Sequence, residues 1–181
     1  MQMLDECNFV DHVLNACLDW FSKRRAQTRR PVKEAAAAHQ QEETAASPYC
    51  WEAFVLFLAE LLTALAGVGR RRETGPSAPL GGLFCLAVLL CDCGQIMLRE
   101  LAENALHEAS VLVLRYVLVK AGKTANWYAP THIQALMSSL RKAFLDLRYS
   151  AQVHKVVMEV IELCASGWEL DATQEDYYCG P

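Results

Sequence analysis

Hydrophobic residues recur along most of this chain at intervals of three and four, the spacing of amphipathic helices. The first such stretch covers about residues 8–24. The polar stretch at 25–46 offers no apolar face to bury, so we expect it to be a solvated connector. Ser47 and Pro48 then predict a helix start, because serine caps free backbone amides and proline fits the first turn. The apolar pattern continues from Trp51 to Leu65.

Glycines and prolines divide the rest of the chain into further predicted helices. Gly67 and Gly69 are expected to end the helix that begins at Pro48, and a loop is expected at 70–78. The helices that follow are predicted at about 80–103, 104–121, 131–148 and 151–165. A bend or split is expected near Cys91-Asp92-Cys93-Gly94, a helix end at Gly122 and a turn at 126–130. Ser150 is expected to cap the last helix, and Ser166-Gly167 to end it.

No segment shows the strict alternation of apolar and polar residues that strands require. We therefore predict an all-α fold in one domain, 1–181, with an acidic, aromatic tail at 168–181. Two architectures fit: a closed bundle with one centre, and an α-solenoid in which stacked helix pairs touch their neighbours. The wide apolar stripes on the second and fourth helices favour the stack, whose inner helices are buried on two sides.

The composition agrees with a packed, soluble protein. Hydrophobic residues make up 53% of the 181 residues, and the formal net charge is −4, so attraction to nucleic acid has to rest on a local patch. The N-terminus lacks the basic and apolar regions of a signal peptide. The most apolar stretch, Leu80 to Cys91, is too short to cross a bilayer, and Asp92 interrupts it. We expect a protein of the cytoplasm, with the nucleus as a second location, and no membrane.

Little in the sequence points to catalysis. No phosphate-binding loop, dinucleotide-binding glycine motif or nucleophile elbow is present. The eight cysteines contain no C-x-x-C pair, so the usual zinc spacing is absent, and we expect most thiols to pack as small core residues. We therefore predict a protein that is not an enzyme and that uses neither a metal nor a cofactor. The cysteines are Cys7, Cys17, Cys50, Cys85, Cys91, Cys93, Cys164 and Cys179.

Four stretches carry a resemblance to a known family. The run Val156–Trp168, VVMEVIELCASGW, resembles the closing helix of the middle domain of eukaryotic translation initiation factor 4G, and the pair Tyr177-Tyr178 lies where small relatives of that domain carry one. The run Trp51–Leu58, WEAFVLFL, looks like the helix of the family's second repeat, and Val13-Leu14-Asn15 looks like part of the helix before it. The likeness is greatest to the short relatives, which include the cap-binding-complex-dependent translation initiation factor and the stem-loop-binding-protein-interacting protein.

The resemblance implies a HEAT-like α-solenoid of stacked antiparallel helix pairs that serves as an adaptor in mRNA translation. Its implied partners are a DEAD-box helicase of the initiation factor 4A type or mRNA-binding proteins, with RNA and a second copy of the chain as further partners. Compared with the family pattern, this chain is expected either to lack the first helix pair or two or to carry them in altered form. The loop after Leu65 and the helix from Leu80 also depart from the pattern, which puts family contacts on that side in doubt.

Exposed arginine and aromatic side chains are the candidates for partner contacts, because such residues dominate binding hot spots. Arg70, Arg71 and Arg72 form a local basic run, for which the simpler interpretation is a solvated loop. Trp127 and Tyr128 are expected in a turn, where they either face a partner or pack within the loop. Trp168, Tyr177 and Tyr178 are candidates in the tail, and the simpler interpretation is that the tail folds back on the last helices.

Two other classes of function stay open on the sequence alone. An unrelated helical interaction module in signalling or cell-death control would show a closed bundle with a long apolar groove. An enzyme would show a deep pocket lined by paired carboxylates or by cysteine and histidine.

Overall fold

The computed structural model describes residues 6–28, 48–71, 80–103 and 110–179, and every regular element within these ranges is an α-helix. The prediction of an all-α fold is thus confirmed for the described residues. Most of the expected connector at 25–46 lies outside them, although 25–28 are the last residues of the first helix. The helices are α1 (Glu6–Thr28), α3 (Pro48–Arg71), α4 (Leu80–Ala102), α5 (Ser110–Tyr128), α6 (Pro130–Phe144), α7 (Ala151–Ala165) and α8 (Ala172–Cys179).

The contacts between residues divide the chain into two compact units, 1–54 and 55–181, with the boundary inside α3. An aromatic cluster joins α1 to the first turns of α3 within the first unit. The Trp20 ring stacks on Trp51 with centroids 5.7 Å apart and lies 4.3 Å from the Phe54 ring. The Arg24 guanidinium lies 5.5 Å from the Trp51 ring centroid. This cluster buries Trp51, the first apolar residue of the predicted stripe.

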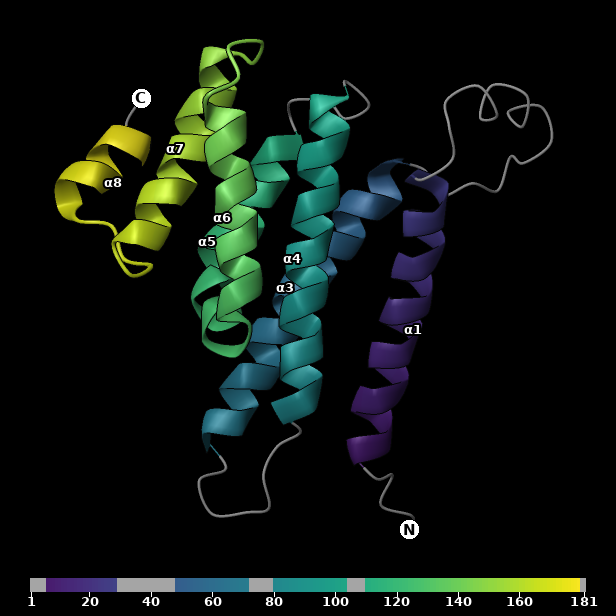
Figure 1. Ribbon diagram of the computed structural model, residues 1–181. Helices are drawn as coiled ribbons and strands as arrows, with labels where there is room; N and C mark the ends of the chain where they lie inside the picture. Colours follow the sequence, from purple (N-terminus) through teal and green to yellow (C-terminus); the bar gives the residue numbers. More distant parts are fainter. Residues whose placement is uncertain (1–5, 29–47, 72–79, 104–109, 180–181) are drawn as a thin grey trace, which may run out of the picture. The chain divides into compact units, whose positions relative to one another are not determined.

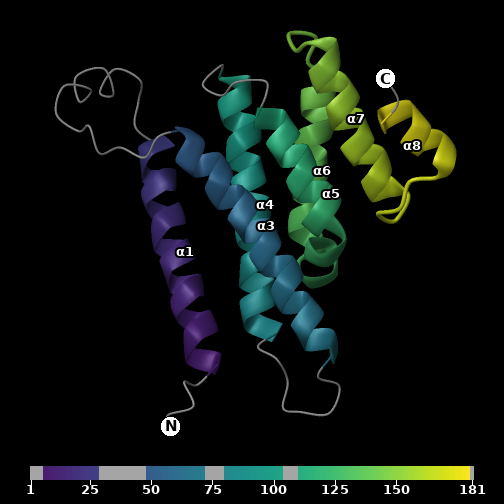
Figure 2. The same ribbon diagram turned by 180° about the vertical axis from the view of Figure 1, so that it is seen from behind.

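The second unit is built from helices that pack on their successors along the chain. Helix α4 packs on α5 and α6, α5 packs on α6 and α7, α6 packs on α7, and α8 packs on α7. Figures 1 and 2 show α5, α6 and α7 side by side from two opposite directions. Their apolar stripes meet in a core of fully buried side chains, which includes Leu86, Met97, Val117, Leu118, Ile133, Leu136, Met137, Leu140 and Val157.

Helix α4 is continuous through Gly94, so the sequence-based expectation of a split there is wrong. A β-carbon built on Gly94 would lie 3.1 Å from the methyl groups of Leu136 on α6 and 3.2 Å from Leu114 Cδ1 on α5. The glycine therefore serves the close approach of two neighbouring helices, and that packing outweighs its low helix propensity of about 1 kcal/mol. Cys91 and Cys93 are both buried beside it, as expected of core thiols.

The predicted ends of α3 and α5 at glycines are also wrong. Helix α3 continues past Gly67 and Gly69 to Arg71, and α5 continues past Gly122 to Tyr128. Only Ala129 separates α5 from α6, so the expected turn at 126–130 is reduced to one residue. Its cause is Pro130, which disfavours helical geometry at the residue before it and begins α6 itself.

Gly122 has a packing role that explains why the helix does not end there. A β-carbon on Gly122 would lie only 1.9 Å from Cζ3 of Trp168, so the indole ring occupies the space that any side chain would need. Trp168 is 9% exposed and has a positive φ of 71°, which is uncommon for a residue other than glycine. Burial of the ring against α5 holds that backbone conformation in place.

Both ends of α7 follow the sequence prediction. The Ser150 hydroxyl accepts a hydrogen bond from the Val153 amide at 3.3 Å, which makes Ser150 the N-cap. At the other end, the Gly167 amide donates to the Cys164 carbonyl at 3.3 Å and the Trp168 amide donates to the Leu163 carbonyl at 2.7 Å. These two bonds form a Schellman motif around Gly167, whose φ is 78°.

The tail folds into a short helix, α8, which the sequence analysis treated only as an acidic, aromatic segment. The Asp171 side chain accepts hydrogen bonds from the amides of Thr173 and Gln174, both at 2.9 Å, while the Gln174 side chain accepts one from the Asp171 amide at 3.1 Å. This is a capping box, a pattern that is visible in the sequence as an aspartate followed three residues later by a glutamine.

One segment, Gly81–Ala102, is long and apolar enough to cross a membrane by length and composition, because α4 runs unbroken through Asp92. The expectation that this stretch is too short was therefore wrong. The protein itself buries 67% of the most apolar window of this helix, as it would the core helix of a folded domain.

Candidate protein-binding surface

Four large apolar side chains lie exposed along one face of α5. Leu112, Tyr116 and Val119 are 48%, 46% and 47% exposed, and Trp127 is 81% exposed. Their spacing of four, seven and fifteen residues from Leu112 places them in one strip of the helix, over about 22 Å of its length. We call this strip the α5 outer row. Several exposed apolar side chains on one face are typical of binding sites, whereas single exposed residues are not. The exposed Lys123 lies between Val119 and Trp127 on this strip.

Polar contacts hold the middle of the α5 outer row against α3. The Tyr116 hydroxyl donates a hydrogen bond to Glu60 Oε1 at 3.2 Å, and Lys120 Nζ lies 2.5 Å from the same oxygen. The hydrogen bond from Lys120 lowers the pKa of the Glu60 carboxyl and raises the pKa of Lys120 itself. The three groups are exposed, so they orient the row and contribute little stability.

A buried ion pair fixes α5 to α7 on another side. Arg115 donates from Nε and Nη2 to the two carboxylate oxygens of Glu159, at 2.6 and 2.5 Å. Glu159 is only 4% exposed, so its charge depends on this bidentate contact. Lys123 also pairs with Glu169, at 2.5 Å, just beyond the Trp168 contact. Helix α5 is thereby tied to α3, to α7 and to the segment after α7.

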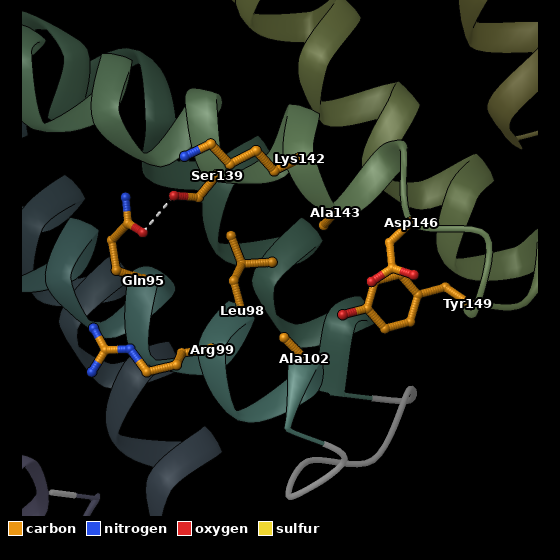
Figure 3. Close-up of a pocket in the computed structure, with 9 residues that line it drawn as sticks. All are labelled: Gln95, Leu98, Arg99, Ala102, Ser139, Lys142, Ala143, Asp146 and Tyr149. Carbon is orange, nitrogen blue, oxygen red and sulfur yellow. Dashed lines mark hydrogen bonds between the residues drawn. The ribbon is translucent and has the colours of Figure 1, made fainter.

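A groove of about 290 Å³ lies between the C-terminal halves of α4 and α6. Its floor is formed by Leu98 with Ala102 and Ala143 (Figure 3). Arg99 on α4 and Lys142 on α6 lie on opposite sides of the groove, and both charged ends point toward the end that holds Gln95 and Ser139. There the Ser139 hydroxyl donates to Gln95 Oε1 at 2.7 Å.

The other end of the groove is formed by the loop between α6 and α7. Asp146 and Tyr149 line it (Figure 3). Arg148 donates to the Asp146 carboxylate from its amide, its Nε and its Nη2, at distances from 2.6 to 3.1 Å. These bonds lower the pKa of Asp146 to about 2, while burial raises the pKa of the Tyr149 hydroxyl. The groove therefore has hydrogen-bond donors at one end and a neutralised carboxylate at the other.

The predicted contact residues differ in their exposure and in the elements that carry them. Trp127 is strongly exposed and joins the α5 outer row, although it lies in a helix and not in the turn that we expected. Tyr128 follows it and is half-buried. Arg70 and Arg71 form the end of α3 rather than a loop, and the described structure does not include their side chains. Arg72 lies outside the described residues.

The aromatic residues of the tail are mostly internal, which corrects the interpretation of them as a set of partner anchors. Trp168 is buried against Gly122. Tyr178 is 8% exposed and donates a hydrogen bond to Glu162 Oε2 at 2.8 Å, and its pKa is raised by burial and by this carboxylate. Only Tyr177 stays exposed, with Lys155 Nζ 5.5 Å from its ring centroid. The simpler interpretation, that the tail folds back on the last helices, thus fits Trp168 and Tyr178.

Most residues of the α5 outer row and of the groove could not be predicted from the sequence. Leu112, Tyr116 and Val119 share α5 with the buried stripe, so hydropathy alone does not show which face of an apolar helix is left uncovered. The groove also went unnoticed, because it joins residues from α4 and α6 that are about 40 positions apart in the sequence. The apolar spacing predicts Leu147 on the buried face of a longer helix, but Leu147 lies beyond the end of α6 and is 92% exposed. Leu145, the C-cap of α6, is 75% exposed.

Within the described ranges, no group of three or more histidine, cysteine and acidic side chains is placed to hold a metal ion. Cys17, Cys91 and Cys93 are buried, and desolvation raises the pKa of Cys91 to about 12, which makes that thiol a poor nucleophile. Cys85 and Cys164 are half-buried, and no disulfide joins any of these five.

Comparison with known proteins found no match among family models, curated proteins or solved structures.

Proposed function

We propose that this chain is a non-enzymatic adaptor in mRNA translation whose α5 outer row binds another protein. The observation that carries the proposal is the exposed strip of Leu112, Tyr116, Val119 and Trp127 on a helix that is otherwise fixed by packing and ion pairs. A rigid strip with aromatic residues is suited to binding because little side-chain freedom is lost on association.

The proposed architecture is a HEAT-like α-solenoid. Its support is the order of the helix contacts: α4 packs on the next two helices, α5 on the next two, and α6 on the next one. Such an order is typical of repeat stacks, in which each element touches its neighbours and leaves outer ridges free. Trp168 at the end of α7, with α8 after it, covers the last helices as a terminal cap does.

The partner class comes from the resemblance to the middle domain of initiation factor 4G. A DEAD-box helicase of the initiation factor 4A type is the proposed partner, with mRNA-binding proteins next. The cytoplasm is the proposed location, because initiation takes place there.

A pull-down of a purified helicase of the 4A type on the immobilised full chain tests this function. We expect retention of the helicase by the natural chain and at least a tenfold loss of affinity with Trp127→Ala, the size expected of one aromatic hot spot. Phe84→Ala is the matched control, since Phe84 is an exposed aromatic residue on α4. If the natural chain does not retain the helicase, the proposed partner is wrong. If the α5 outer row binds only signalling or cell-death proteins, the alternative function as an unrelated interaction module is favoured.

A further inference from the structure

The groove between α4 and α6 presents hydrogen-bond donors at one end, from Arg99, Lys142 and Gln95. Arg99 and Lys142 are both exposed, and no described carboxylate lies within ion-pair distance of either. Gln95 uses its carbonyl oxygen to accept from Ser139, and no described residue accepts a hydrogen bond from its amide nitrogen. Figure 3 shows the Arg99 guanidinium and the Lys142 ammonium on opposite sides of the pair that Gln95 and Ser139 form, so two positive charges flank this end of the groove and favour a carboxylate there.

We propose that this groove binds an extended segment of a partner protein, with an Asp or Glu side chain between Arg99 and Lys142 and an apolar side chain next to it. The inference rests on the proposed function in assuming a protein partner, and it adds a second contact with its own chemistry. Charge complementarity selects the occupant, since the only carboxylate in the lining, Asp146, lies at the far end and is already neutralised by Arg148.

The size and floor of the groove suit a few side chains. A volume of about 290 Å³ is at the lower end of ligand sites, which is large enough for two or three side chains of a peptide. Leu98, Ala102 and Ala143 provide an apolar floor between the polar ends. Leu145 and Leu147 flank Asp146 in the loop at the far end, and both are strongly exposed. Neither leucine lines the groove itself, whose apolar surface for the neighbouring side chain comes from Leu98, Ala102 and Ala143.

The loop that carries these leucines is ordered by its own hydrogen bonds. Besides the Arg148 contacts, the Asp146 amide donates to the Ala143 carbonyl at 3.1 Å, and the Tyr149 amide donates to the Asp146 carbonyl at 3.4 Å. Ser150 then caps α7. A preorganised loop loses little conformational freedom when a peptide binds, so Asp146 and Tyr149 form a fixed end of the groove.

The same chemistry argues for a peptide over RNA. Binding of a single strand uses aromatic faces on which bases stack, and the only aromatic residue of the lining, Tyr149, is half-buried next to the Asp146 carboxylate.

Selection of a random peptide library displayed on phage, with the immobilised full chain as bait, tests the proposal. We expect enriched peptides that contain an Asp or Glu within three positions of a Leu, Ile, Phe or Met. The most enriched peptide, synthesised with a fluorescein label, should bind the full chain about tenfold more weakly with Arg99→Gln or Lys142→Gln, as expected when one charged contact is lost. Its affinity should also fall as NaCl increases, because exposed charges are screened.

Lys23→Gln is the control, since it removes an exposed lysine from α1, and it should leave the affinity unchanged. Circular dichroism should show that all three variants keep their helical content. A labelled oligouridine is measured in parallel.

Enriched peptides without acidic residues would overturn the proposal, and so would a peptide affinity that neither Arg99→Gln nor Lys142→Gln changes. The third contradicting outcome is that no peptide is enriched while oligouridine binds in a way that depends on Arg99. Trp127→Ala should leave the selected peptide's affinity unchanged. The peptide measurements thus test the groove alone, whereas the helicase pull-down tests the α5 outer row.

Discussion

At the scale of single residues, the contact between Gly122 and Trp168 shows how one small side chain decides local packing. Alanine normally stabilises a helix relative to glycine by about 1 kcal/mol. At this position its β-carbon would meet the indole ring at 1.9 Å, so the ring has to move, and its backbone is already held at an uncommon φ.

Gly122→Ala is expected to lower the free energy of unfolding by about 1–3 kcal/mol, the usual cost of overpacking a core. The measurement is urea unfolding of the full chain followed by circular dichroism. Gly67→Ala is the matched control, because nothing lies within 4 Å of a β-carbon built there, and it should be neutral or stabilising by up to about 1 kcal/mol. Equal stability of the two variants would show that Trp168 does not occupy this space.

The titration of Asp146 tests the loop at the end of the groove. Its pKa of about 2 lies below the ordinary value of 3.8 because Arg148 donates to the carboxylate. A depressed pKa means that folding favours the ionised form: the contribution to stability is present above the unfolded pKa and is lost as the pH falls toward 2.

We therefore expect the carboxyl carbon resonance of Asp146 in NMR spectra to titrate near pH 2 in the natural chain. With Arg148→Gln, the midpoint should move up toward 3.8. An unchanged midpoint in that variant would mean that Arg148 does not hold the carboxylate.

At the scale of whole elements, the sequence predicted where helices exist better than where they end. The apolar spacing indicated every described helix except α8, and Ser150 and Ser166-Gly167 bounded α7 correctly, since caps are local features. Helix ends or breaks were wrongly predicted at Gly67, Gly94 and Gly122. At Gly94 and Gly122 the glycine instead makes room for side chains that are distant in the sequence. Of the candidate site, the sequence named only Trp127 as a contact residue, with packing inside a loop as the alternative, because exposure depends on which helix covers which face.

The link between α5 and α7 is expected to depend on the pairing of Arg115 with Glu159. Arg115→Met leaves a buried carboxylate without this bidentate partner. Because the Arg115 side chain is 31% exposed, we expect a loss of about 2–3 kcal/mol, below the full cost of breaking a buried pair. The double variant Arg115→Met/Glu159→Leu should recover to within about 1 kcal/mol of the natural chain.

A double-mutant cycle from urea unfolding measures this coupling. A double variant that is less stable than Arg115→Met alone would contradict this prediction, because removal of the buried carboxylate should relieve the cost of leaving it unpaired.

At the scale of the whole molecule, the proposed function follows from what the packing of the second unit leaves uncovered. Helices α4 to α7 pack on their successors along the chain and bury their apolar stripes between them. The α5 outer row and the groove between α4 and α6 stay open as a result, one apolar and one cationic. Two contacts on one adaptor would raise its affinity for a partner that reaches both, because the second contact forms within the complex.

Proximity labelling in cells is the most direct test of the central claim, that the α5 outer row recruits translation proteins. A labelling enzyme fused to the full chain should enrich a 4A-type helicase or mRNA-binding proteins, and this enrichment should be lost with the double variant Leu112→Ala/Trp127→Ala and kept with Phe84→Ala. Identical labelling by the natural chain and the double variant, or enrichment of neither class by the natural chain, would contradict the account.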